Sequence, residues 1–236
     1  MIQQQLDIFG KVKIEDIKTE GIKYAGSKLK IIPFILQIVS ELEDVVNVLD
    51  GFSGTTRVSQ ALAQIGFDTT ANDISTWSEV FGTCYLNSKG TDKYYKEIID
   101  YLNSLKGYDG WFTQNYGGEE AQSKKPFQAK NTRKLDAIRD EIDSMNLSWE
   151  DKCVILTSLI YALDSVDSTL GHYVAYLSDW SSRSYNDLVL KLPKRFPIIS
   201  NNSVIKDDIF NTISKNKYDF VYLDPPYGSN NEKMPP

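Results

Sequence analysis

The sequence predicts an α/β protein with a doubly wound parallel sheet and a mostly helical insertion. Three observations lead to this fold class. Residues 45–73 read as strand, glycine turn, helix and strand, and both predicted strands finish at an acidic residue. Residues 77–194 show mainly the apolar spacing of helices. Strand character then returns, and a final aromatic and β-branched run at 218–223 leads into Asp224-Pro225-Pro226-Tyr227.

The first part of the chain supplies the opening βαβ unit. A turn of small residues, Lys23-Tyr24-Ala25-Gly26-Ser27-Lys28, precedes its first helical pattern. The predicted elements in chain order are a helix at 29–42, a strand at 45–50, a glycine loop at 51–56, a helix from Val58 to Ile65 capped by Gly66, and a strand at 67–74. This succession is typical of the start of a doubly wound sheet.

The middle of the chain is predicted to interrupt that sheet. Its predicted helices are 79–86, 94–105, 131–145 and 149–166, with a polar, glycine-containing stretch at 107–125. Strand patterns follow at 197–199, 203–205 and 207–209, then a short helix at 209–214 and the strand at 218–223. We therefore predict an α/β domain from residues 1–76 and 197–236, and an inserted domain from residues 77–196.

Composition narrows the class of protein. The 236 residues include 41% hydrophobic residues, which suits one large globular domain or a domain with an insertion. Cys84 and Cys153 are the two cysteines, so neither a disulfide framework nor a zinc cluster is expected. No run of about 18 apolar residues predicts a membrane span, and the N-terminus lacks the pattern of a signal peptide. We expect a cytoplasmic protein that requires no metal.

Charge is distributed unevenly along the chain. The net charge of -6 argues weakly against a nucleic-acid partner, although the local field decides such binding. Two stretches are nevertheless basic, and either could be an ordinary solvated face. The basic residues are Lys124, Lys125, Lys130, Arg133, Lys134 and Arg139 in the first stretch, and Arg183, Lys191, Lys194 and Arg195 in the second. We favour a surface that faces phosphates.

The tetrapeptide Asp224-Pro225-Pro226-Tyr227 has a distinctive chemistry. Proline has no N–H to give to a sheet, so two prolines end the strand and stiffen the turn. The turn then presents a carboxylate, carbonyl groups without ladder partners and a flat ring. These groups suit a planar base that carries an amino group. The alternative is that the four residues merely terminate a strand.

The glycine loop and the second strand point to a ligand at the same edge. Asp50, Phe52 and Gly54 lie at the carboxyl end of a strand, where open parallel sheets bind ligands. The loop is not Gly-x-Gly-x-x-Gly and has no lysine, so it favours a ligand without a pyrophosphate. Asp73 ends the next strand, where an acid commonly binds ribose hydroxyls. An ordinary turn acid is the alternative for Asp73.

Taken in order, these motifs resemble the adenine-specific DNA methyltransferases of the Dam-like type. The resemblance implies a Rossmann-like sheet that binds S-adenosylmethionine, interrupted by a target-recognition domain. It implies that residues 23–28 wrap the methionine end of the cofactor, that Asp73 binds its ribose, and that Asp208, with Asp207 as the alternative, meets its adenine. The implied cofactor-binding residues are Tyr24, Ala25, Gly26, Ser27, Lys28, Asp50, Phe52, Gly54, Thr55, Asp73, Asp208 and Asp224.

The resemblance also implies the reaction and its partners. Asp224, Pro225, Pro226 and Tyr227 would be catalytic: Asp224 and the carbonyl of Pro225 accept the two N–H groups of an adenine that has left double-stranded DNA, and Tyr227 stacks on it. A cognate restriction nuclease is a further implied partner. The implied DNA-binding residues are Lys124, Lys125, Lys130, Arg133, Lys134 and Arg183.

Two alternatives to this function remain open. The enzyme could methylate another amine, in cytosine, RNA or a protein side chain, although Asp at position 224 favours adenine. The chain could also be a DNA- or cofactor-binding module without catalysis. Relatives of this type continue well beyond the tetrapeptide, whereas this sequence stops nine residues after Tyr227. We therefore expect either a fragment of a longer protein or a chain completed by a partner.

Overall fold

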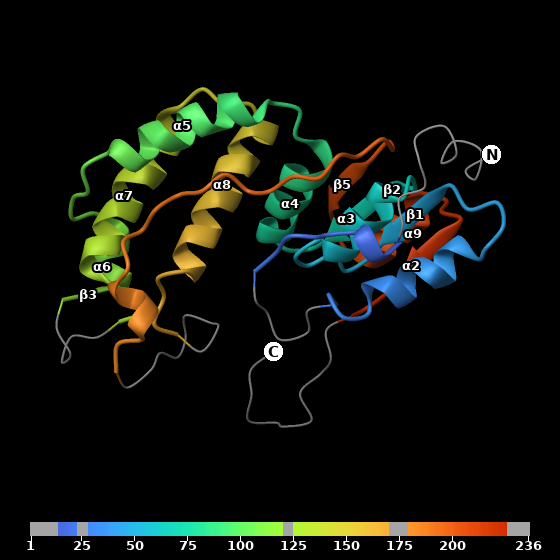
Figure 1. Ribbon diagram of the computed structural model, residues 1–236, viewed down its shortest axis with the longest axis horizontal. Helices are drawn as coiled ribbons and strands as arrows, with labels where there is room; N and C mark the ends of the chain where they lie inside the picture. The colour runs from blue at the N-terminus through green and yellow to red at the C-terminus, as the bar shows by residue number, and fades with distance from the viewer. Residues whose placement is uncertain (1–13, 23–27, 120–124, 170–178, 226–236) are drawn as a thin grey trace. The chain divides into compact units, whose positions relative to one another are not determined.

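The computed structural model describes residues 14–22, 28–119, 125–169 and 179–225. The chain divides into two compact units (Figure 1). The first, called the sheet unit below, comprises Met1–Thr19, Lys28–Gly82 and Phe196–Pro236. The second, called the helical unit, comprises Glu20–Ser27 and Thr83–Arg195. The prediction placed the insertion at 77–196; its role in target recognition stays a prediction.

The sheet unit is built on parallel strands. Its described strands are β1 (Asn47–Asp50), β2 (Asp68–Asp73), β5 (Ser203–Lys206) and β6 (Phe220–Tyr222). They lie side by side in the order β5-β2-β1-β6, and each neighbouring pair is parallel. Val48 and Leu49 of β1 are both fully buried, as expected of a central strand covered on both faces.

The register of the sheet is fixed at both ends of β1. The Asp219 carboxylate accepts hydrogen bonds from the backbone N–H groups of Val46 and Asn47, at 2.9 and 2.8 Å. At the other end the N–H of Gly51 donates to the Tyr222 carbonyl at 2.9 Å. Asp50 therefore lies opposite Tyr222, and Leu223, directly after β6, lies beside Gly51 of the loop after β1.

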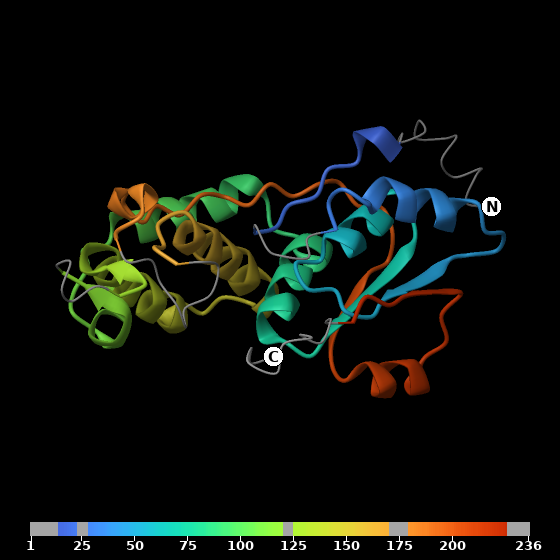
Figure 2. The same cartoon turned by 90° about the horizontal axis from the view of Figure 1, so that it is seen from below.

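Helices cover both faces of this sheet. They are α2 (Ile32–Ser40), α3 (Arg57–Gln64), α4 (Thr76–Gly82) and α9 (Ile209–Lys215), and a short 3-10 turn, η1 (Ile14–Asp16), precedes them. Figure 2 shows α2 and α3 on one face and α9 on the other. The chain leaves β1 towards β2 and β5, and returns to its other side at β6. The point between β1 and β6 is therefore a topological switch point, where open α/β sheets bind ligands.

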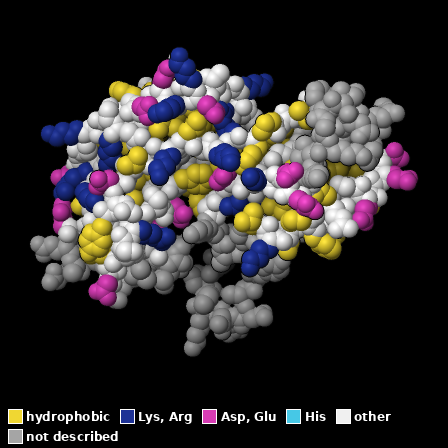
Figure 3. Space-filling view, viewed as in Figure 1, with side chains coloured by type: hydrophobic (Ala, Val, Ile, Leu, Met, Phe, Trp, Pro, Cys, Tyr) yellow, Lys and Arg dark blue, Asp and Glu magenta, His cyan; other side chains and the backbone are white. Residues whose placement is uncertain are grey.

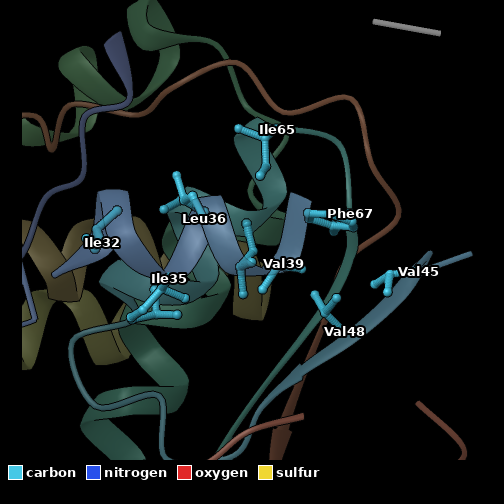
Figure 4. Packing of buried hydrophobic residues seen from close by; sticks show 11 residues of the cluster. Ile32, Ile35, Leu36, Val39, Val45, Val48, Ile65 and Phe67 are labelled. Atoms are coloured by element: carbon cyan, nitrogen blue, oxygen red, sulfur yellow. The ribbon is translucent and has the colours of Figure 1, made fainter. Parts of the chain in front are cut away.

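The main core of the sheet unit lies between α2, α3 and the sheet (Figure 4). Leu36 and Val39 of α2 are fully buried, and so is Leu62 of α3. Burying one such side chain contributes roughly 1.5–3 kcal/mol. The apolar spacing at 29–42 predicted this helix but not which of its faces is buried, since Phe34 and Ile38 are exposed. Gly66 ends the helix as predicted, with a φ of 101° that side chains rarely adopt.

The helical unit contains the elements of the middle of the chain. They are the π-helical turn η2 (Thr83–Asn87), α5 (Asp92–Ser104), α6 (Trp111–Tyr116), β3 (Gly117–Gly118), β4 (Phe127–Gln128), α7 (Ala129–Ser144), α8 (Trp149–Asp164) and η4 (Ser182–Tyr185). Side-chain oxygens of Thr91 and Ser148 cap α5 and α8. Leu102, Ile138 and Ile155 are fully buried in its core.

Asparagine side chains hold the extended segment 186–191 in the helical unit. The Asn131 amide oxygen accepts from the N–H of Leu188 at 2.9 Å. Asn103 bonds both the N–H and the carbonyl of Leu190, each at 2.9 Å. Leu188 and Leu190 are buried beneath these bonds. Side-chain amides thus form the hydrogen bonds of backbone N–H and carbonyl groups that belong to no strand here.

Several predicted elements were wrong. Residues 197–199 form no strand, and Ile199 is exposed. A side chain contacts the start of β2 just after this segment, because Asn202 Oδ1 accepts from the N–H of Thr69 at 3.1 Å. Residues 207–209 form no strand either, because Asp208 caps α9. The helix predicted at 79–86 is divided between α4 and η2, and the polar stretch 107–125 contains α6.

A search of the described residues for a helix long and apolar enough to cross a membrane finds none.

Candidate active site at the carboxyl edge of the sheet

The carboxyl ends of three strands bring three predicted acids to one edge of the sheet. Asp50 ends β1, Asp73 ends β2, and Asp224 follows β6. The carboxylates of Asp73 and Asp224 both help to raise the pKa of Asp50. This cluster lies at the switch point, so residues far apart in sequence form a single candidate site.

Hydrogen bonds to both neighbouring strands fix the glycine loop. The N–H of Ser53 donates to the Asn72 carbonyl at 2.9 Å, and the Asn72 amide donates to the Gly51 carbonyl at 3.1 Å. The hydroxyl of Thr212 in α9 donates to Asn72 Oδ1 at 2.8 Å. Asn72 is 1% exposed and was missed by the sequence analysis, although an amide beside a strand-end acid is a usable signal.

Two left-handed residues shape the end of this loop. Gly54 has a φ of 48°, and Thr56, at the N-cap of α3, has a φ of 59°. A β-branched residue at positive φ is uncommon and costs about 1–3 kcal/mol. Phe52 is partly exposed, whereas Thr55 is buried. Glycine at position 54 therefore suits a backbone conformation that other residues rarely adopt.

Asp50 is the most deeply buried of the three acids, with 1% of its surface exposed. Its Oδ2 atom accepts hydrogen bonds from the N–H of Ser59 at 3.1 Å and from the Ser59 hydroxyl at 2.6 Å. Burial nevertheless raises the pKa of Asp50 to about 7, and the nearby carboxylates add to the shift. A cationic group of a ligand would be attracted to this carboxylate and would favour its charged form.

Asp73 is held in a defined orientation by backbone groups. The N–H of Gly54 donates to its Oδ2 atom and the N–H of Ser75 to its Oδ1 atom, both at 2.9 Å. Each carboxylate oxygen has a further lone pair that can accept from a hydroxyl. The next residue, Ile74, is 72% exposed and was missed by the sequence analysis. An apolar side chain placed beside an oriented acid suits a ligand with hydroxyls and a flat ring.

The two acids before α9 differ in their contacts. Asp208 is exposed and caps α9, with Oδ1 accepting from the N–H of Phe210 at 2.8 Å. Asp207 bonds Asn211 and Lys215 of the same helix, and these bonds lower its pKa to about 2. The carboxylate of Asp207 is thus engaged at both oxygens by α9, so Asp208 remains the better candidate for a ligand.

Asp224 forms an ion pair with Lys28. Lys28 Nζ lies 2.7 Å from Asp224 Oδ2, and each side chain is 19% exposed. Pro225 follows and is exposed. The sequence predicted both residues for the site but did not predict this contact. The remaining predicted residues of these two motifs, Tyr24, Ala25, Gly26, Ser27, Pro226 and Tyr227, lie outside the described residues.

The residues predicted to bind DNA have acidic or carbonyl partners within the helical unit. Lys130 pairs with Asp187 at 2.7 Å, and Lys125 Nζ donates to the Gln114 carbonyl at 2.7 Å. Lys134 donates to backbone carbonyls at the end of α5, and burial lowers its pKa.

The two predicted arginines pair with acids as well. Arg133 pairs with Asp109 and Glu119, and Arg183 pairs with Asp167. Figure 3 shows Lys and Arg side chains interspersed with Asp and Glu over the helical unit. DNA binding by these residues stays a prediction, and Lys124 lies outside the described residues.

No group of three or more His, Cys, Asp or Glu residues within the described ranges is arranged to hold a metal ion.

The sheet order, the glycine loop and the acid that ends β2 together define a protein with a Rossmann-like fold and a candidate ligand site at the carboxyl ends of its strands. The chain belongs to the D12 class of N6 adenine-specific DNA methyltransferases, because the model of that family matches residues 24–234. The predicted family and the predicted fold class are confirmed.

The chain is also similar to proteins that are named as a modification methylase and as type II methyltransferases. The chain is 30% identical over 226 residues to modification methylase StsI of Streptococcus sanguinis, covering 88% of this chain and 34% of that protein. It is 28% identical over 218 residues to the type II methyltransferase M.NlaIII of Neisseria lactamica, covering 88% and 65%. It is 24% identical over 229 residues to M.FokI of Planomicrobium okeanokoites, covering 87% and 34%. The chain thus spans about a third to two thirds of the length of these relatives.

Proposed function

We propose that this protein transfers a methyl group from S-adenosylmethionine to the N6 amino group of adenine in duplex DNA. One observation carries the proposal: in a chain of this family, Asp224 and Pro225 follow β6 at the switch point, beside the loop after β1 and near Asp73. Asp224, proposed to accept from the amino group, thus lies at the same edge of the sheet as Asp73, proposed to accept from the ribose hydroxyls, and this arrangement supports the proposal.

The residues at this edge fit the proposed cofactor. Asp73, oriented by two backbone N–H groups, can accept from the ribose hydroxyls. Ile74 offers an exposed apolar side chain for the adenine ring, and Asp208 an acceptor for its amino group. Asp50 would bind a cationic group of the cofactor. Burial raises the pKa of Asp50 to about 7, and a bound cation would favour the charged form of its carboxylate. When bound, S-adenosylmethionine supplies an electrophilic methyl group on a sulfonium.

Asp224 and Pro225 would activate the substrate nitrogen. The lone pair of an adenine amino group is delocalised into the ring, so the nitrogen is a poor nucleophile. The Asp224 carboxylate accepts one N–H and the Pro225 carbonyl accepts the other, which favours a tetrahedral nitrogen with a localised lone pair. Pro225 has a fixed φ and no N–H, which restricts the chain at these two acceptors, and holding them in orientation would supply much of the catalysis. The nitrogen would take the methyl group from the sulfonium, which would leave as an uncharged thioether, and the nitrogen would release one proton to solvent water.

The base must leave the duplex before it can reach Asp224, since its amino group is stacked and paired within DNA. We assign the recognition of the DNA site to the helical unit. A cognate restriction nuclease is the proposed biological partner, because the relatives include a modification methylase and type II methyltransferases.

The test is transfer of labelled methyl groups from S-adenosylmethionine to mixed-sequence duplex DNA, followed by analysis of the nucleosides. We expect label in N6-methyl-2′-deoxyadenosine and a loss of transfer of at least about a thousandfold in Asp224→Ala, with DNA affinity largely retained. Label in methylcytidine would instead identify a different amine. Cofactor binding without transfer to any DNA would identify a binding module and contradict the proposal.

A further inference from the structure

The helix α9 carries Asp208 at its N-cap but has little packing of its own to hold it in place. It is seven residues long, and isolated helices shorter than about 12–15 residues are marginal in water. Among residues 209–215, all of which the structure describes, Thr212 alone is buried, whereas Phe210 and Ile213 are exposed. The position of Asp208 therefore depends on the contacts that anchor α9 to the sheet.

A chain of three hydrogen bonds supplies one such anchor. The Thr212 N–H donates to the Asp208 carbonyl at 3.1 Å, and the Thr212 hydroxyl donates to Asn72 Oδ1 at 2.8 Å. The Asn72 amide donates in turn to the Gly51 carbonyl at 3.1 Å. These bonds connect the acid proposed to meet the cofactor adenine with the glycine loop that follows Asp50.

The bridge between Asn72 and Thr212 has a defined direction. The Gly51 carbonyl is an acceptor, so it requires the NH2 group of Asn72, and the amide oxygen of Asn72 must then face Thr212. Both side chains are buried, where a missing partner is costly. Hydrogen bonds are directional. The bridge therefore fixes the rotation of α9 as well as its distance from the loop.

An apolar contact brings α9 to the glycine loop a second time. A Cβ atom at Gly51 would lie 2.7 Å from Cδ1 of Ile209, so the residue directly after Asp208 packs closely on this loop. Apolar packing has no directional preference. This contact sets the distance between α9 and the loop, and leaves the rotation of the helix to the bond made by Thr212.

We propose that Asn72 and Thr212 are positioning residues of the cofactor site. They hold α9 against the glycine loop, which keeps Asp208 in register with Asp50 and Asp73. The inference rests on the proposed function, which assigns parts of the cofactor to these three acids. Asn72 and Thr212 act through Asp208, and a site held in register in advance binds a ligand that spans it more tightly.

The test compares two ligands that differ at the edge of the base where Asp208 is proposed to bind. S-adenosylhomocysteine carries the adenine amino group, whereas S-inosylhomocysteine has a carbonyl in its place and a proton on N1. Titration calorimetry gives the affinity of each ligand for the full chain, and the ratio of the two affinities measures selectivity. We expect a ratio of at least about ten in the unsubstituted protein, lowered at least about fivefold in Thr212→Val and in Asn72→Ala. General destabilisation would not move this ratio.

Further variants separate the bridge from ordinary packing. Thr212→Ser keeps the hydroxyl and should keep the ratio within about twofold. Thr212→Ala removes the hydroxyl without placing a methyl group against Asn72, so it should repeat the loss and tests the same bond should Thr212→Val not fold. Thr70→Val, the matched control, breaks a hydroxyl contact with Ser203 at 2.9 Å elsewhere on β2 and should leave the ratio unchanged. In an Asp208→Ala background, Thr212→Val should have no further effect.

The outcomes separate this inference from the function on which it rests. An unchanged ratio in Thr212→Val and Thr212→Ala, with selectivity present in the unsubstituted protein, would overturn the bridge alone. Equal binding of the two ligands by the unsubstituted protein would remove Asp208 from the adenine site and would overturn the inference as well. Selective binding that falls in Thr212→Val, without methyl transfer to any DNA by the unsubstituted protein, would refute the proposed function while the bridge stands.

Discussion

Asp50 shows how a single side chain depends on the burial that folding imposes. An acid at the end of a predicted strand is visible in the sequence, as is the glycine loop that follows it. Its complete burial and its bonds to Ser59 depend on α3 packing against the sheet. The position of this site residue could therefore be predicted, whereas its titration near neutral pH could not.

The raised pKa of Asp50 predicts a pH-dependent stability. The carboxyl has a pKa of about 7 in the folded protein and about 4 when unfolded, so folding favours its protonated form. This contribution to the unfolding free energy, about 4 kcal/mol, is complete below pH 4 and lost as the pH rises through 7. Asp50→Asn should flatten that part of the profile, measured by urea unfolding from pH 4 to pH 8. An unchanged profile in the variant would contradict the assignment.

At the scale of elements, α6 shows a helix held by a residue of its neighbour. None of its side chains is fully buried. The Asp136 carboxylate of α7 accepts from the N–H groups of Gly110, Phe112 and Thr113 and from the Thr113 hydroxyl, at 2.6–3.0 Å. The polar stretch 107–125 gave no helical pattern, because this helix depends on a carboxylate that lies more than twenty residues away in sequence.

Removing the Asp136 carboxylate should therefore destabilise the helical unit. Asp136→Ala leaves several N–H groups without their acceptor, and we expect a loss of about 3 kcal/mol in unfolding free energy. Asp140→Ala, which removes an exposed carboxylate of the same helix, is the control and should lose less than about 1 kcal/mol. Urea midpoints at constant slope measure both. Equal losses in the two variants would show that the α6 contacts contribute nothing specific.

At the scale of the whole molecule, the order of motifs predicted the fold class and the family. Local patterns were sufficient for β1, α3, β2 and β6, because strand and helix periods and glycine turns are local signals. Pairs that join distant segments were not predictable, and Lys28 with Asp224 is the clearest case. Residues 197–199 form no strand, and the residues that follow them contact the start of β2 through side chains: Asn202 Oδ1 accepts from the N–H of Thr69, and Asp68 Oδ1 accepts from the N–H of Asn201.

Cofactor binding should stabilise the fold through Asp73. At a hundred times its dissociation constant, S-adenosylhomocysteine would add about 2.7 kcal/mol, or roughly 5–10 °C in the unfolding temperature. Asp73→Ala should abolish this gain, whereas Asp68→Ala, at the opposite end of β2, should retain it. Thermal unfolding with and without the ligand is the measurement. A full gain in Asp73→Ala would remove Asp73 from the cofactor site.

The strand order has a consequence for how the site is made during synthesis. β1 pairs with β6, although 172 residues separate Asp50 from its partner Tyr222. A ribosome adding about 5–20 residues per second needs roughly 10–30 s to cover that distance. During that interval one edge of β1 is unpaired in the nascent chain, and the residues that follow β6 are not yet beside the glycine loop. The Asp224 carboxylate therefore joins this end of the sheet only after the whole helical unit has emerged.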